Sequence, residues 1–220
     1  MSNISRRKSL AFLAGAPAAG WLVGKGLQSS ASTLASEDRW KQVDPREMIR
    51  QRYFPNVVLT THENKKVRLY DDLVKDKVML INFMYTSCER LCPRVTQNLV
   101  HVQKLLGDRM GRDFFFYSFS LDPKNDTAKV LSDYAAMHKV GPGWSFLTGD
   151  PDEIEHLRRI LGFTDPDPEQ DKDKDSHIGN VRYGNERRQL WGACPGMSQA
   201  DFIVEALSWV DWPKGQKPGA

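Results

Sequence analysis

An almost unbroken apolar run, from Val78 to Met84 with only Asn82 polar, limits the folds open to this chain. A strand with one face in water alternates polar and apolar residues, whereas a continuous apolar run is typical of a strand covered on both faces. Such strands occur in α/β proteins, in which helices pack on both sides of the sheet. The run therefore predicts a central strand that helices must cover.

The segments around this run supply the helices. Apolar residues at helical spacing follow Pro93 and stop near Gly107, and further strand and helix patterns alternate after them. We expect strands over 78–84, 114–121, 144–147, 178–183 and 188–191, helices over 93–106, 126–138 (capped by Asp126-Thr127), 151–161 and 199–210, a turn at Gly184-Asn185, and a small hairpin from 57–59 and 66–69. This order predicts an α/β fold with a central mixed β-sheet flanked by helices and an extra N-terminal β-hairpin.

The N-terminal segment differs from the rest of the chain. Arg6-Arg7-Lys8 precede a mildly apolar run of 15 residues, Leu10–Gly24, and then a Ser/Ala-rich stretch. The run is shorter than the ~20 apolar residues that a spanning helix needs, so it predicts an export signal. The two arginines resemble the twin-arginine signal of bacteria; ordinary secretion and an uncleaved membrane anchor are the alternatives. The predicted location is the periplasm or the outer face of the cytoplasmic membrane.

These patterns divide the chain into four parts. We expect an export signal over 1–35, a polar lead-in over 36–53, one folded domain over 54–213 and a tail over 214–220.

The charge balance gives no support for nucleic-acid binding. The formal net charge is +3, but four basic and no acidic residues lie in 1–35, which leaves 27 basic against 28 acidic side chains in the remainder. The remainder therefore has no basic excess with which to bind a phosphate backbone. Three cysteines are also too few for a disulfide scaffold, and their small number indicates a functional use.

Two cysteines, Cys88 and Cys92, lie between the apolar strand and the helix that follows it. Residues four apart on a helix share one face, so two sulfurs at this spacing can share a metal or close a disulfide. The N–H groups and dipole of a helix N-terminus also favour the thiolate, which binds soft metals and attacks disulfides. The alternative is that both cysteines are buried and act only as small apolar side chains. A strand-to-helix turn is a less favourable place to bury a side chain, so this alternative is the weaker one.

Three motifs together resemble the SCO/SenC family over residues 54–210. They are Phe83-Met-Tyr-Thr-Ser-Cys88-Glu-Arg-Leu-Cys92-Pro93, Ser120-Leu-Asp122-Pro123-Lys-Asn-Asp126-Thr127 and the late His177. This family comprises exported or membrane-linked proteins of thioredoxin fold that bind copper and serve assembly of the copper centre of cytochrome c oxidase. The resemblance implies a thioredoxin-like fold, copper as the cofactor, and Cys88, Cys92 and His177 as its ligands. It also implies that Asp122 lies behind the ligands or contacts the partner.

The ligand chemistry is consistent with copper. Thiolates suit Cu(I), and a neutral imidazole suits both copper states. With two thiolates, Cu(I) gives a site with one net negative charge and Cu(II) a neutral site, so both states are tolerable. Zinc is the alternative metal, although structural zinc generally takes four protein ligands and only three are proposed. The other histidines, His62, His101, His138 and His156, are expected to be structural.

Cys194 is a third cysteine, outside the core pattern of the family. If the last two strands are antiparallel, the chain leaves along 178–183 and returns along 188–191, so that Cys194 comes back near His177. We hypothesise that Cys194 acts there as a fourth sulfur, a resolving thiol or a thiol for exchange with a partner. The alternative is a cysteine with no such role at a helix start. Met84 and Met197 carry further soft sulfur atoms, and we expect both side chains in the core.

Three functions fit these residues. The first is an exported metallochaperone that delivers copper to cytochrome c oxidase or a similar cuproenzyme, with a copper donor as a further partner. The second is a thiol-disulfide oxidoreductase that prepares the copper-site cysteines of the acceptor, with one of Cys88 and Cys92 attacking and the other resolving. A thiol reductant is then a further partner. The third is a copper or redox sensor that signals through a partner. The metallochaperone is the main prediction.

Overall fold

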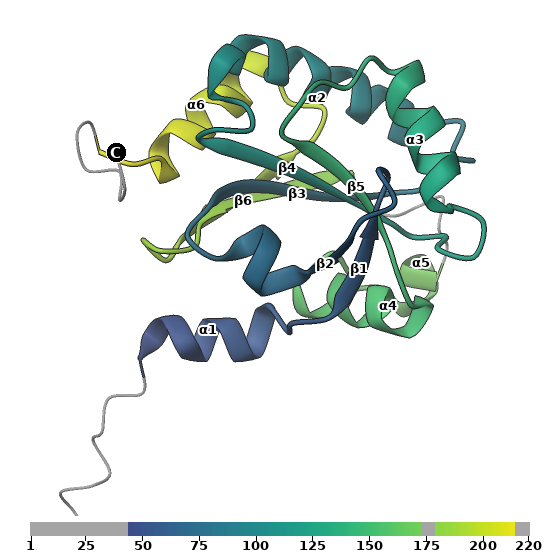
Figure 1. Ribbon diagram of the computed structural model, residues 1–220, viewed down its shortest axis with the longest axis horizontal. Coiled ribbons are helices and arrows are strands. Elements are labelled where there is room, and N and C mark those ends of the chain that lie inside the picture. Colours follow the sequence, from purple (N-terminus) through teal and green to yellow (C-terminus); the bar gives the residue numbers. More distant parts are fainter. Residues whose placement is uncertain (1–43, 173–178, 214–220) are drawn as a thin grey trace, which may run out of the picture. The chain divides into compact units, whose positions relative to one another are not determined.

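The computed structural model describes residues 44–172 and 179–213 (Figure 1). In this part of the chain, seven strands form one sheet in the order β2-β1-β5-β4-β3-β6-β7. The strands are β1 (Val58–Thr61), β2 (Lys66–Arg68), β3 (Val78–Met84), β4 (Phe114–Ser120), β5 (Trp144–Thr148), β6 (Asn180–Asn185) and β7 (Leu190–Pro195). The helices are α1 (Pro45–Tyr53), α2 (Cys92–Leu106), α3 (Ala128–Met137), α4 (Pro151–Ile160), α5 (Pro168–Lys172) and α6 (Ala200–Val210), with a π-helix, η2 (Leu69–Val74), and a 3₁₀ turn, η3 (Gly107–Arg109).

The predicted mixed sheet is confirmed, and the apolar run is its centre. All residues of β3 are buried. This strand pairs in parallel with β4 and antiparallel with β6. Because β3 and β4 run in parallel from Val78↔Phe114 to Met84↔Ser120, both end at the same edge of the sheet. The loops that follow these two strands therefore begin side by side.

Helices cover both faces of the sheet, as Figure 1 shows with α2, α3 and α6 on one side and α1 and α4 on the other. Alternate residues of β3 point to opposite faces. Leu80 and Met84 belong to the cluster with α2 and α6, whereas Met79 and Ile81 belong to the cluster with η2 and α4. Burying one such side chain contributes about 1.5–3 kcal/mol. The two clusters therefore explain why β3 is apolar at successive positions.

The predicted N-terminal hairpin is also confirmed. β1 pairs antiparallel with β2, and β1 also pairs antiparallel with β5, so the hairpin extends the main sheet. The helix before it, α1, lies within the predicted lead-in. The predicted export signal and tail lie outside the described residues. No described helix has the length and apolarity needed to cross a membrane.

The last hairpin turns later than predicted. Gly184 and Asn185 lie within β6, and the turn occupies residues 186–189. The reason is a distant ion pair: Glu186 is 1% exposed, and its two carboxylate oxygens accept hydrogen bonds from the Arg46 guanidinium, both at 2.6 Å. The strand continues until this carboxylate reaches α1, so a Gly-Asn sequence that is typical of a turn remains extended.

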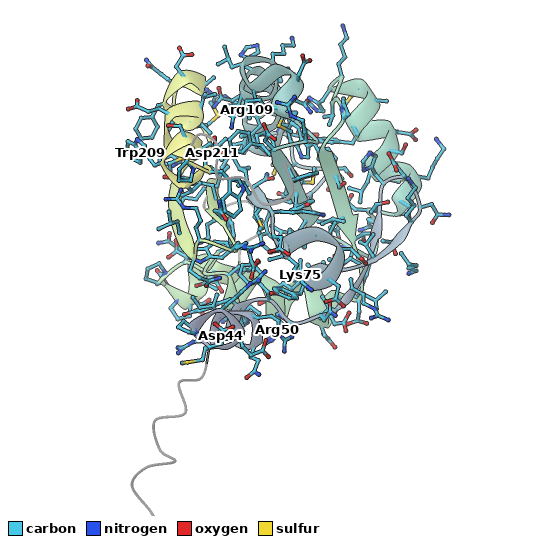
Figure 2. The ribbon with its side chains drawn as sticks, turned by 60° about the vertical axis from the view of Figure 1, so that its left-hand side comes forward. Asp44, Arg50, Lys75, Arg109, Trp209 and Asp211 are labelled. Atoms are coloured by element: carbon cyan, nitrogen blue, oxygen red, sulfur yellow. The ribbon has the colours of Figure 1, made fainter. Side chains whose placement is uncertain are left out.

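The final helix, α6, packs against α2. Its end is held by Arg109, which follows α2 and donates a hydrogen bond to the Asp211 carboxylate (Figure 2). The side chain of Arg188 donates to the backbone carbonyl of the same residue. These contacts fix α6 beside α2, the helix that begins at Cys92.

Candidate functional site

Cys88 lies in the turn between β3 and α2, and its sulfur acts as the helix cap. Leu91, at the N-cap position, offers no side-chain acceptor. Instead, the backbone N–H of Cys92 donates to the Cys88 Sγ at 3.4 Å. The first N–H groups of a helix have no partner within the helix, and its dipole favours negative charge at this end. The turn therefore places one sulfur where its thiolate is stabilised.

The two thiols of this turn differ in acidity. Burial acts to raise the pKa of Cys88, but hydrogen bonds from the backbone and thiol of Cys92 and from the backbone N–H groups of Arg90 and Leu91 outweigh burial and lower it. Burial raises the pKa of Cys92 to about 12, and its hydrogen bond to Cys88 acts in the same direction. Cys88 is therefore the thiol that ionises first, while Cys92 retains its proton.

This difference predicts a stepwise alkylation by iodoacetamide. Cys88 should react with a pH midpoint below its ordinary pKa of 9.0, because only the thiolate is nucleophilic and the folded protein lowers this pKa. Cys92 should react only at much higher pH. Peptide mass spectrometry across a pH series measures both midpoints in the reduced protein. Equal midpoints for the two cysteines would contradict the assignment.

A buried carboxylate lies behind the cysteine turn. Asp126 is 1% exposed and accepts hydrogen bonds from the Thr86 backbone N–H at 3.2 Å, from the Thr86 hydroxyl, and from the Ser120 hydroxyl at 2.6 Å. The sequence predicted Asp126-Thr127 as a helix cap, but Thr127 alone caps α3, by accepting from the Val130 N–H. The side chain of Asp126 faces the turn that holds Cys88, a role that sequence reasoning missed although its motif was recognised.

A tyrosine from α3 also lies beside the cysteines. The hydroxyl groups of Tyr134 and Thr96 are 3.0 Å apart, and Thr96 follows Cys92 by one turn of α2. Burial is the main cause that raises the pKa of Tyr134 to about 12, and negative charge on Cys92, Cys88 and Asp126 acts in the same direction. Negative charge on either thiol therefore acts on the Tyr134 hydroxyl. No sequence motif indicated it.

Asp122 lies in the loop after β4, where it is partly exposed. Its backbone N–H donates to the Ser120 hydroxyl oxygen at 3.0 Å, and its carboxylate accepts a hydrogen bond from the Asn125 side chain at 2.8 Å. Asp122 therefore shares Ser120 with Asp126 and lies on the more exposed part of the same loop.

His177 lies outside the described residues, the next of which is Gly179. A Cβ atom on Gly179 would lie 2.5 Å from Cδ2 of Leu91, so Gly179 lies directly against the turn between the two cysteines. The backbone N–H of Gly196 donates to the Gly179 carbonyl at 2.7 Å. The start of β6 is thus held between the cysteine turn and the end of β7.

Cys194 lies in β7, opposite Val181 of β6, and is buried in the same apolar cluster as Cys88 and Cys92. Burial raises its pKa. All three cysteines are in the thiol form. Over residues 44–172 and 179–213, no group of three or more His, Cys, Asp or Glu side chains is placed to hold a metal ion. The role of Cys194 therefore stays a prediction.

The other soft or basic side chains are structural or exposed. Met84 is in the core as predicted, whereas Met197 is 43% exposed, so its predicted core position is wrong. His62 accepts a hydrogen bond from the Phe146 backbone N–H at 3.2 Å, in agreement with a structural role.

An apolar cavity of about 470 Å³ lies on the other face of β6 and β7, and no candidate site residue lines it.

Comparisons of sequence identify the family of this chain. The SCO1/SenC family model matches residues 50–210. The SCO1 protein homolog of Bacillus subtilis (strain 168) is 38% identical over 97 residues, which are 43% of this chain and 49% of that protein. The match thus spans about half the length of this curated relative.

Comparisons of structure agree with the fold. The structure of BsSco, described as a member of the Sco family of cytochrome c oxidase assembly proteins with a disulfide switch, is 26% identical, covers 72% of this chain and 92% of that chain, and has a TM-score of 0.59. Bradyrhizobium japonicum ScoI with copper bound is 23% identical, covers 70% of this chain and 96% of that chain, and has a TM-score of 0.56. The predicted thioredoxin-like fold is confirmed. Because the family model matches well over half of the sequence, this chain belongs to the SCO1/SenC family.

Proposed function

We propose that this chain is an exported metallochaperone that binds copper and delivers it to cytochrome c oxidase or a similar cuproenzyme. The observation that carries the proposal is the pair of sulfurs in one turn. Cys88 lies at the N-terminus of α2, and the backbone N–H of Cys92 donates to the Cys88 Sγ at 3.4 Å. Two thiolates are soft ligands that suit Cu(I). Copper is bound in the Bradyrhizobium japonicum relative, and BsSco is described as belonging to a family of cytochrome c oxidase assembly proteins.

His177 completes the proposed ligand set. Gly179, which follows His177 by two positions in the sequence, lies against Leu91 in the cysteine turn, and this supports His177 as the third ligand. A neutral imidazole adds a ligand suited to both copper states. Asp122, on the exposed part of the neighbouring loop, is our proposed contact for the acceptor, and Cys194 our proposed thiol for exchange.

Copper binding in this proposal is coupled to proton release. Both thiols must give up their protons to bind the metal, Cys88 more readily because its pKa is lowered and Cys92 less readily because its pKa is raised. Protons therefore compete with copper, and the affinity falls as the pH is lowered. Transfer to the acceptor proceeds by ligand exchange, in which thiolates of the acceptor replace Cys88 and Cys92 one at a time.

The second candidate is a thiol-disulfide oxidoreductase, which the unequal acidity of the two thiols favours. The Cys88 thiolate would attack a disulfide in the acceptor and form a mixed disulfide while one acceptor sulfur leaves as a thiolate. Cys92, after losing its proton, would then attack Cys88 and release the second acceptor sulfur. The acceptor gains two electrons, and the chain is left with a Cys88–Cys92 disulfide.

Replacing His177 with alanine separates these two functions. We expect the variant to bind copper about 10- to 100-fold more weakly, which is the typical loss when a group that supports a metal ligand is mutated. The Cys88/Cys92 disulfide should still form. The measurement is titration of the reduced protein with Cu(I) and Cu(II). His156→Ala is the matched control, because His156 is exposed on α4 and lies outside the proposed ligand set. Unchanged copper affinity in His177→Ala would refute the ligand set.

The N-terminal segment determines the proposed location. Residues 1–35 would direct export and leave the folded domain in the periplasm or anchored at the outer face of the membrane. The mass of the protein recovered from fractionated bacterial cells tests this proposal, since a cleaved signal, a retained anchor and a cytoplasmic full-length chain differ in mass or fraction.

A further inference from the structure

We infer that Asp126 is a positioning residue that fixes the cysteine turn from behind and thereby sets the reactivity of the Cys88/Cys92 pair. The effect of Asp126 on copper affinity rests on the proposed function, whereas its effect on the equilibrium between the two thiols and their disulfide does not. Asp126 would act through Thr86 and would touch neither the metal nor the acceptor.

Three donors converge on this carboxylate from two segments of the chain. The Thr86 backbone N–H and hydroxyl come from the cysteine turn, and the Ser120 hydroxyl comes from the end of β4. A carboxylate only accepts, and its two oxygens offer about four lone-pair positions, so one side chain can hold all three donors. Asp126 therefore joins the cysteine turn to the loop after β4.

The sheet register explains why the hydrogen bonds of Asp126 to Thr86 and Ser120 control the position of the cysteines. Met84 is paired with Ser120, and the Leu121 N–H donates to the Met84 carbonyl at 2.7 Å, so both loops leave the sheet at one point. Thr86 is two residues beyond Met84 and two residues before Cys88. The position of Thr86 therefore determines where the Cys88 sulfur meets the first N–H groups of α2.

Burial makes a purely local explanation inadequate. Asp126 is 1% exposed, and it forms no ion pair among the described residues. Leaving a polar group buried is costly unless it is hydrogen-bonded, so its position depends on the donors of the cysteine turn. Helix capping does not explain it either, because Thr127 caps α3.

Asp126→Asn tests the inference. Asparagine has almost the same shape, but its amide nitrogen is a donor and must face a Thr86 or Ser120 donor. The described turn is the dithiol form, so we expect the equilibrium with glutathione to move about tenfold toward the disulfide, which corresponds to about 30 mV. Copper affinity should fall about tenfold, as is usual when a group behind a metal ligand is lost.

The control is Asp133→Asn on α3, since Asp133 is 66% exposed and pairs only with Lys129 among the described residues. It should leave both values as in the wild type. Asp126→Asn with lowered stability but an unchanged glutathione equilibrium would show a merely structural role and overturn the inference. If that variant fails to fold, Thr86→Val removes only the hydroxyl donor, and the same two outcomes decide. A wild type that binds no copper would refute the proposed function, while the glutathione equilibrium would still test Asp126.

Discussion

Cys88→Ser should abolish stoichiometric copper binding and all disulfide formation with Cys92. The serine hydroxyl can still accept the Cys92 N–H that now reaches the sulfur at 3.4 Å, so the start of α2 is retained. A hydroxyl oxygen is, however, a poor ligand for Cu(I), and it cannot form a disulfide. The loss should exceed the ~10- to 100-fold weakening expected when a metal-site neighbour is changed.

Titration of the reduced variant with Cu(I) in the presence of a competing chelator measures this loss. Cys92→Ser is the informative comparison, because it should lose copper equally but retain the easily alkylated Cys88 thiolate. Circular dichroism of both variants checks that the fold is retained. One full equivalent of tightly bound copper in Cys88→Ser would place the metal elsewhere and refute the proposed site.

The parts of this site that sequence reasoning predicted are local in the chain. The apolarity of β3, the spacing of Cys88 and Cys92, and the proline at the start of α2 all lie within one short segment, and each has a physical meaning without knowledge of distant residues. A strand buried on both faces followed by a helix start is enough to predict where the two sulfurs lie.

The parts that it missed depend on register and on distant partners. Asp126 faces the cysteine turn only because β3 and β4 pair Met84 with Ser120, which no local pattern reveals. Tyr134, on α3, reaches Thr96 of α2, one turn after Cys92. The late turn after β6 follows from an ion pair between Glu186 and Arg46, which lie 140 residues apart. Short-range patterns cannot predict contacts of this kind.

Gly143→Ala is expected to cause the largest loss of stability, because two independent penalties meet there. Gly143 has φ +81°, a conformation that L side chains rarely adopt, and such backbone strain costs about 1–3 kcal/mol. The new Cβ would also lie 2.2 Å from the backbone nitrogen of Gly111 and 2.6 Å from its Cα. Overpacking typically costs a further ~1–3 kcal/mol, and the clashing atoms are backbone atoms that cannot rotate away.

The position ties this strain to the sheet. The Gly143 carbonyl accepts the Phe116 N–H at 2.9 Å, and the clashing Gly111 N–H donates to the Phe114 carbonyl at 2.8 Å. Relief of the clash must therefore displace the start of β4, whose far end supports the cysteine turn.

Gly107→Ala is the matched control for this change. Gly107 also has a positive φ, +53°, but no described atom lies within 4 Å of the position that a new Cβ would take, so this variant carries the backbone penalty without the clash. Chemical denaturation gives the free energy of unfolding of each variant, and the difference between them measures the clash. Because a typical domain is stable by only about 5–15 kcal/mol, the summed cost in Gly143→Ala should lower the denaturation midpoint severely. Equal losses in the two variants would show that β4 and β5 can separate at this end without cost, and that the close approach of Gly111 and Gly143 does not support the sheet.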